Sequence, residues 1–217
     1  GGAGGNGALA ITATAEVKAS GSSTVLIVAG AGGDGGNGGE HTEVMNITQG
    51  KLSMGFVTDI TNRDPRFAAM QVCNALFGAG QTSKLFMEVR ERMSLCYAIG
   101  SAYHGSKGIL TVSAGIDSAQ EANVRARVLE QLDDCQKGRI TQEELISARE
   151  ALSSSLRTVH DSPGAMENYY ASAVQSGLKL TVQEYMDAAA SVTIEQIAEV
   201  AKQLRLHTVF FLKGVQV

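Results

Sequence analysis

The stretch FGAGQTSKLFMEVRERMSLCY, residues 77–97, joins a glycine-rich turn, a short amphipathic segment and the start of a strand. At first its glycines resemble a phosphate-binding loop. However, the spacing G-x-x-x-x-G-K-[ST] is absent, and the turn follows a predicted helix instead of a strand. We therefore predict a helix-to-helix turn, in which the glycines supply backbone freedom and Thr82 or Ser83 caps the next helix. The inward side chains of that helix are predicted to be Leu85, Phe86, Val89 and Met93.

Upstream of this stretch the sequence predicts a strand and then a helix. Leu52, Met54 and Phe56 alternate with smaller residues, which indicates a half-buried strand. Asp64-Pro65 predicts a helix with proline at its first position. The residues expected along its buried side are Phe67, Met70, Asn74 and Phe77.

Downstream, two strands and a series of helices are expected. The segments LCYAIGSAYHG and GILTVSAGID predict a hairpin whose turn spans 104–108. Helix starts are predicted by Ser162-Pro163 and by four capping boxes, in which a side chain at each end satisfies a backbone donor of the other. The boxes begin at Ser118, Thr141, Thr181 and Thr193, and the closing HTVFFLKG predicts a last strand.

This order of elements predicts the fold class. Strands and helices do not alternate through the second half, so a doubly wound parallel sheet is not favoured. We predict an α+β fold: a largely antiparallel or mixed sheet with its helices packed on one face. The domain is expected to span 40–217, and 1–39 to be glycine-rich linker segments flanking one short edge strand, STVLIVAG.

Composition narrows the classes of function. The 217 residues are 44% hydrophobic and 18% charged, which suits one globular domain. The net charge of -4 gives no general attraction to nucleic acid or to an anionic membrane, so neither is expected as a partner. No apolar run approaches the roughly 20 residues that cross a bilayer.

Glycine spacing raises a nucleotide-binding alternative. Residues 30–35 and 2–7 both match G-x-G-x-x-G. That fingerprint needs a helix after its last glycine to hold the pyrophosphate, and GNGGEHTE is a poor helix start. A flexible linker is the favoured interpretation, with a dinucleotide site as the distant alternative.

Metal and nucleophile signals are weak in this chain. Cys73, Cys96 and Cys135 lack C-x-x-C spacing and are expected to be reduced core residues. No two histidines lie within five positions, so neither H-E-x-x-H nor H-x-x-E-H is present. We therefore expect no catalytic residue, metal ligand or cofactor in this chain alone.

Arg90 and Tyr97 are the candidate binding residues. A guanidinium and a phenolic hydroxyl can both donate hydrogen bonds to a carbonyl that is becoming an oxyanion. From the residues alone, the favoured interpretation of Arg90 is a surface cation paired with a nearby glutamate, and that of Tyr97 is a strand aromatic. Spacing and composition leave both interpretations open.

The run from Leu76 to Asp117 resembles the pitrilysin/insulinase peptidases, which include the mitochondrial processing peptidase and the core subunits of complex III. The matching elements are the glycine-rich turn, Ser-Lys-Leu-Phe, Arg90-Glu91, Ser-Leu-Cys-Tyr97 and the hairpin. The similarity continues through DSPGAMENYYASAVQSG and TVQEYMDAAASVTIEQIAEVAKQL to the final strand, and so covers about 43–214.

This resemblance implies a function and its partners. Two halves of such proteins close around an unfolded peptide, and the N-terminal half holds zinc through H-x-x-E-H. The later half supplies an arginine and a tyrosine, which correspond to Arg90 and Tyr97. The resemblance therefore implies a C-terminal peptide-binding half, inert alone, whose partner is a zinc-bearing N-terminal half or a homologous subunit. The alternative is a non-catalytic scaffold or companion subunit.

Two departures from the family pattern stand out. The usual Gly-Leu-Ala becomes Ser94-Leu95-Cys96, a variant associated with bacterial members, so we expect a bacterial cytoplasmic protein in preference to one of the mitochondrial matrix. The glycine-rich 30–39 also stands where the family has a helix.

Overall fold

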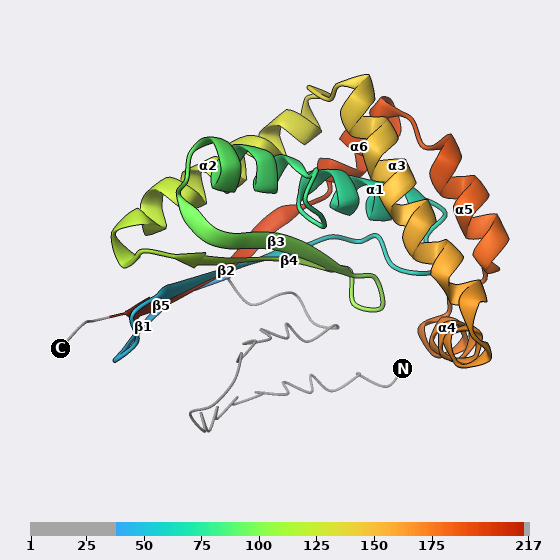
Figure 1. The fold of residues 1–217 in the computed structure, drawn as a ribbon, viewed down its shortest axis with the longest axis horizontal. Coiled ribbons are helices and arrows are strands. Elements are labelled where there is room, and N and C mark those ends of the chain that lie inside the picture. Colours follow the sequence, from blue (N-terminus) through green and yellow to red (C-terminus); the bar gives the residue numbers. More distant parts are fainter. Residues whose placement is uncertain (1–37, 215–217) are drawn as a thin grey trace, which may run out of the picture.

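The computed structural model describes residues 38–214, and these form one five-stranded sheet with helices on one face (Figure 1). The strand order is β1-β5-β2-β4-β3. Within the described sheet only β1 and β5 are parallel, and the other neighbours are antiparallel. The strands are β1 (Glu40–Met45), β2 (Gly50–Val57), β3 (Cys96–His104), β4 (Ile109–Ile116) and β5 (Arg205–Gly214).

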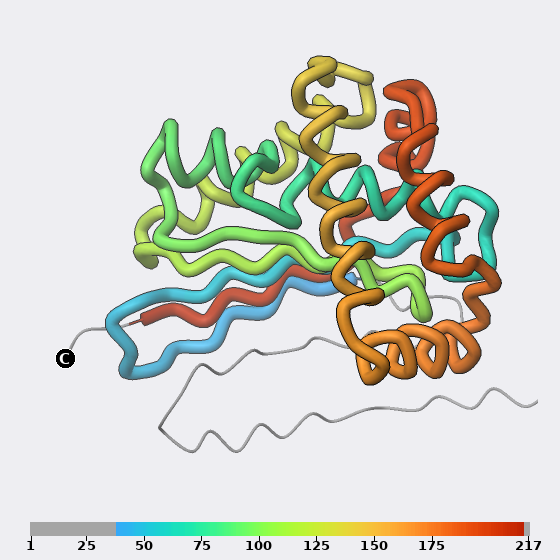
Figure 2. The backbone as a smooth tube through the Cα atoms, turned by 45° about the vertical axis from the view of Figure 1, so that its right-hand side comes forward, coloured from blue at the N-terminus to red at the C-terminus, as the bar shows by residue number. Residues whose placement is uncertain are grey.

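The helical layer lies above the sheet in Figure 1, except for α4, which stands apart near the β3–β4 hairpin. Figure 2 shows that β1, β2 and β5 run side by side to the end of the sheet farthest from α4. The helical elements are α1 (Phe67–Phe77), η1 (Leu85–Arg92), η2 (Ser118–Gln120), α2 (Glu121–Gln136), α3 (Gln142–Arg157), η3 (Thr158–Asp161), α4 (Pro163–Ser176), α5 (Val182–Ser191) and α6 (Ile194–Ala201).

The main core lies between the sheet and this helical layer. Leu52, Met54 and Phe56 of β2 are at most 2% exposed, which confirms the alternation predicted for this strand. All four residues predicted along the inner side of α1 are buried as well. The predicted fold class, a mixed sheet with helices on one face, is therefore confirmed.

Most predicted helix starts are confirmed. The capping boxes at Thr141, Thr181 and Thr193 are all formed, and the Ser162 hydroxyl caps α4, which has a proline in its first turn. The predicted hairpin also forms, and its turn ends at Gly108, which has a φ of +61°. These local signals were reliable because each depends on side chains within one turn of the backbone they satisfy.

The predicted capping box at Ser118 is wrong. Asp117 caps a short 3₁₀ turn instead, and α2 begins at Glu121. The Ser118 hydroxyl accepts a hydrogen bond from the Gly214 amide at 3.0 Å, which ties this turn to the end of β5. A contact with a residue far along the chain therefore replaces the local cap.

Two further boundaries differ from prediction. The first helix begins at Phe67 rather than at Pro65, because the Asp64 carboxylate accepts the Arg66 amide and holds this segment as a turn. Strand β1 was not predicted at all, since EHTEVM is a polar edge strand without alternation. The predicted strand STVLIVAG and the glycine-rich motifs of 2–35 lie outside the described residues.

Within residues 38–214, no helix combines the length and the apolar character needed to cross a bilayer.

Candidate functional site

The segment after the glycine-rich turn is a π-helix, η1, eight residues long. At its end the amide of Met93 donates to the Glu88 carbonyl at 3.1 Å, and that of Leu95 donates to the Val89 carbonyl at 3.0 Å. Such wide turns are rare and occur often at functional sites. They leave Met93 37% exposed, so its predicted inward position is wrong, whereas Leu85 and Val89 are buried as predicted.

The turn before η1 has the predicted capping role. The Ser83 hydroxyl donates to the Gly80 carbonyl at 2.6 Å and accepts the Phe86 amide at 3.4 Å. The Gly78 carbonyl accepts the Ser101 amide of β3 at 3.0 Å. A Cβ on Gly78 would lie 2.6 Å from the Ser101 hydroxyl oxygen, so only glycine allows this close approach to the sheet.

Lys84 is a buried cation that the sequence did not reveal. Its side chain is 9% exposed, and its Nζ lies 2.7 Å from a carboxylate oxygen of Glu144 on α3. Glu144 also closes the capping box of α3 by accepting the Thr141 amide. This ion pair therefore joins the glycine-rich turn to the helical layer and has a structural role.

Arg90 lies in the last turn of η1 and is only weakly paired. Its guanidinium lies 4.6 Å from the centre of the Phe86 ring, a cation–π contact that orients the side chain. The Glu91 carboxylate is 3.6 Å away, at the long end of the ion-pair range, and the Arg90 side chain is 39% exposed. The glutamate pairing that the sequence left open is thus present, but it leaves donors accessible.

Tyr97 lies at a register shift at the start of β3. Cys96 faces Ile116 and Ala98 faces Gly115, so Tyr97 is the extra residue of a bulge. Bulges redirect side chains at sheet edges. Tyr97 is 66% exposed, and its hydroxyl has no hydrogen-bond partner among residues 38–214. Tyr97 is thus a strand aromatic, as the sequence also allowed, and its ring is largely exposed.

The loop between these residues keeps them at one corner. The Ser94 amide donates to the Arg90 carbonyl at 3.1 Å, and Ser94 has a φ of +51°, the left-handed region that favours glycine. Burial raises the pKa of the Cys96 thiol, and the nearby Arg90 guanidinium opposes that rise. The Leu95 amide donates to the Val89 carbonyl at 3.0 Å, which closes the backbone between η1 and β3. Arg90 and Tyr97 therefore lie on either side of the short loop that joins η1 to β3.

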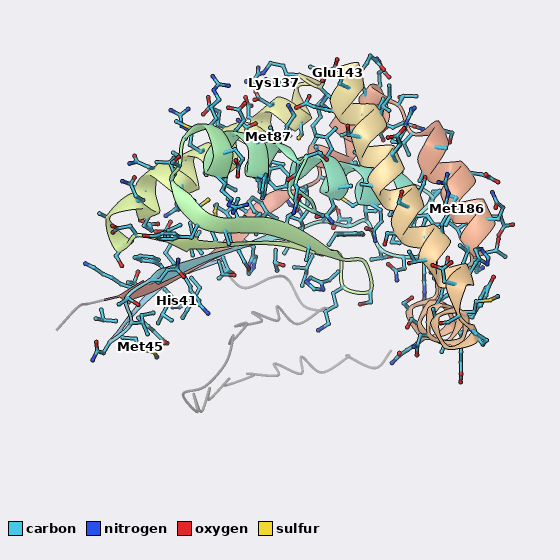
Figure 3. All side chains as sticks on the ribbon, viewed as in Figure 1. His41, Met45, Met87, Lys137, Glu143 and Met186 are labelled. Carbon is cyan, nitrogen blue, oxygen red and sulfur yellow. The ribbon has the colours of Figure 1, made fainter. Side chains whose placement is uncertain are left out.

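The described residues contain no group of three histidine, cysteine, aspartate or glutamate side chains that could hold a metal ion. His41 lies on β1 and Glu143 on the helical layer, well apart in Figure 3. The cysteines are buried and unpaired. Burial raises the pKa of Cys135 to about 12 and that of Cys73 well above its usual value.

The family of the chain follows from its similarity to known proteins. Residues 35–152 match the family model described as Peptidase M16 inactive domain. A Bacillus subtilis protein named "Probable inactive metalloprotease YmfF" is 30% identical over 172 residues, 79% of this chain and 40% of that protein. The chain therefore spans less than half of this relative.

Solved structures share the fold. A conserved protein from Enterococcus faecalis is 34% identical, with a TM-score of 0.77 over 82% of this chain and 42% of that one. The peptidase M16 inactive domain from Pseudomonas fluorescens is 21% identical, with a TM-score of 0.71 over 81% of this chain and 43% of that one. These matches confirm the resemblance found in the sequence, and the chain belongs to the Peptidase M16 inactive domain family.

Proposed function

We propose that this chain is the C-terminal, peptide-binding half of a pitrilysin-type zinc metallopeptidase, in which Arg90 and Tyr97 bind substrate and transition state. The chain alone would be inert, because the zinc motif would lie in an N-terminal half or a homologous partner subunit. An unfolded peptide is the proposed substrate. The proposed compartment is the bacterial cytoplasm, in keeping with bacterial relatives.

One observation supports the proposal: a cation and a phenol with accessible donors lie on either side of the short loop between η1 and β3. Arg90 is 39% exposed and held over Phe86, and Tyr97 is 66% exposed on a bulge. Both arrangements expose polar groups that packing would otherwise cover. An exposed, oriented pair of hydrogen-bond donors suits the binding of a peptide backbone.

The chemistry expected of these residues is electrostatic. When a peptide carbonyl is attacked, its oxygen gains negative charge, and donors already aimed at that position stabilise the transition state more than the substrate. Arg90 would hold this charge, and the Tyr97 hydroxyl would donate a second hydrogen bond. Zinc bound by the other half would supply the activated water.

A second candidate function is that of a non-catalytic scaffold or companion subunit. The observation that favours it is the name of the Bacillus subtilis relative, a probable inactive metalloprotease. In that case the full protein would lack a working zinc centre, and the corner of Arg90 and Tyr97 would bind peptide without hydrolysis.

The test uses the full-length protein that contains this chain. Arg90→Ala and Tyr97→Phe should each lower kcat for an unstructured peptide, by on the order of 100-fold for the arginine, with zinc content unchanged. Arg92→Ala and Tyr170→Phe are matched controls, since Arg92 is 74% exposed on the same helix and Tyr170 is 39% exposed on α4. Both controls should retain normal turnover.

The outcomes separate the two functions. Normal hydrolysis by both Arg90→Ala and Tyr97→Phe would end the assignment of these residues. The scaffold function would be supported if the full-length protein lacks H-x-x-E-H and binds no zinc. It should then hydrolyse no peptide, either alone or with a partner subunit.

A further inference from the structure

A cleft lies at the opposite end of β3 from Tyr97. It has a volume of about 500 Å³, within the usual range for small-ligand sites. Its walls are the 62–65 loop with the start of α1, the 177–180 loop, and α5. The Asn62 amide donates to the Gly105 carbonyl just beyond β3, so the cleft lies roughly 25 Å from Tyr97 along the strand.

The floor of this cleft is apolar. Phe67 and Ala68 of α1 belong to a second hydrophobic cluster, and Leu178 and Leu180 pack against that cluster from the 177–180 loop. The Tyr169 hydroxyl donates to the Leu180 carbonyl at 2.9 Å and fixes the loop. The cleft therefore offers an apolar surface with a defined position.

The rim of the cleft carries positive charge. Arg63 and Lys179 both line it, and neither side chain has an ion-pair partner among residues 38–214. Asp64, the acidic residue in the lining, is already paired: Arg66 donates to its two oxygens at 3.0 and 2.8 Å. This pairing holds the pKa of Asp64 below its usual value, and the Arg66 guanidinium balances the charge of the carboxylate. Two uncompensated cations remain at the rim.

The Arg63 side chain lies against the backbone at the end of α4. Gly177 ends α4 in the left-handed conformation, with a φ of +77°. A Cβ at this residue would lie 2.3 Å from Arg63 Nε. The Arg63 side chain thus lies directly against Gly177, where the Leu178–Leu180 wall of the cleft begins.

We propose that this cleft binds a carboxylate that carries an apolar group, with the apolar group on Phe67 and Leu180 and the carboxylate between Arg63 and Lys179. The C-terminal residue of a peptide and a medium-chain fatty acid share this chemistry. The proposal does not depend on Arg90 and Tyr97, which lie at the other end of β3, and either site can fail alone.

Binding to the 217-residue chain tests the proposal. The probes are N-acetyl-Ala-Leu with a free carboxylate, the same dipeptide as its C-terminal amide, and octanoate, each titrated by calorimetry. The double variant Arg63→Gln/Lys179→Gln should weaken carboxylate binding by on the order of 10-fold. Lys202→Gln/Lys213→Gln removes the same charge from exposed positions outside the cleft and should change nothing.

The probes also identify the source of the ligand. Preference for the peptide acid over its amide indicates a peptide C-terminus, whereas charge-dependent binding of octanoate alone indicates a fatty acid. Equal binding by the Arg63→Gln/Lys179→Gln variant, equal affinity for acid and amide, or no binding of any probe at millimolar concentration overturns the proposal. Thermal unfolding of each variant, with a transition like that of the unmodified chain, shows that the fold is intact.

Discussion

Lys84 and Arg90 are two cations six residues apart on the same segment, and their surroundings are opposite. Lys84 is 9% exposed and lies 2.7 Å from Glu144, a residue of another helix. Arg90 is 39% exposed and lies 3.6 Å from its sequence neighbour Glu91. The first cation joins the glycine-rich turn to α3, whereas the second remains accessible to a ligand.

The same contrast extends to the thiol near each cation. Cys135 is fully buried near Lys84, and Cys96 is 9% exposed near Arg90. Each cation opposes the rise in thiol pKa that burial causes. Burial and pairing therefore decide whether a cation on this segment has a structural role or can contact a ligand.

The largest effect on stability is expected from Lys84→Met. Removing Lys84 from this buried ion pair leaves Glu144 without its cation. Because Glu144 is 28% exposed and can still contact water, we expect the free energy of unfolding to fall by only about 2 kcal/mol. Arg90→Met should cost about 0.5 kcal/mol or less, because an exposed pair contributes little. Urea unfolding of both variants checks the difference.

A matched control separates the ion pair from simple packing. If the pair carries the effect, Lys84→Met combined with Glu144→Gln should cost less than the sum of the single changes. Equal losses for Lys84→Met and Arg90→Met would break the contrast between the two cations.

Alkaline pH should destabilise the protein through its buried thiols. The pKa of Cys135 is about 12 in the folded chain and about 8.5 when unfolded, so above pH 8.5 the unfolded state loses its proton first. Stability then falls as pH rises, by about 1.4 kcal/mol per pH unit for each such thiol. Urea unfolding between pH 8 and 10 should show this slope, and Cys135→Ala should reduce it more than Cys96→Ala. An unchanged slope in Cys135→Ala would contradict the argument.

Thiol labelling should follow the same order. Cys96 lies at the sheet edge near Arg90, while Cys73 and Cys135 are 0% exposed. In native protein at pH 8, iodoacetamide should modify Cys96 first, on the order of 10-fold faster than the others, because local opening exposes it more readily. Peptide mass mapping shows the order in which the three cysteines are modified. Earlier labelling of Cys135 would show that the Lys84 region opens before the Arg90 corner.

Much of the fold was predictable because its signals are local. Alternation in β2 and the three threonine capping boxes depend on neighbours within one or two turns. Strand β1 was missed because its place is set by pairing with β5 at the other end of the chain. The role of Ser118 was mispredicted for a similar reason, since its partner is Gly214.

The candidate site was only partly predictable. Resemblance selected Arg90 and Tyr97, but the π-helix and the bulge that expose them have no recognised sequence signal. The burial of Lys84 was hidden because its partner, Glu144, lies 60 positions away. One sequence signal for this corner was available. The family has glycine where this chain has Ser94, which indicates an unusual backbone conformation, and Ser94 adopts a positive φ.

A small stabilising effect is expected from Ser94→Gly. Glycine removes the cost of a left-handed side-chain residue but adds entropy to the unfolded chain, so a net gain of about 0.5 kcal/mol is expected. Calorimetric melting should show a slightly higher Tm, with Ser94→Ala unchanged or lower. A lower Tm for Ser94→Gly would show that Ser94 stabilises the corner of Arg90 and Tyr97 in another way.

The central claim is that Arg90 recognises a transition state, and a phosphinate peptide that mimics the tetrahedral intermediate tests it most directly. In zinc-loaded full-length protein, Arg90→Ala should weaken phosphinate binding by on the order of 100-fold, the same factor by which it lowers kcat/KM. Arg92→Ala should leave both unchanged. Unaltered phosphinate affinity in Arg90→Ala would contradict the claim.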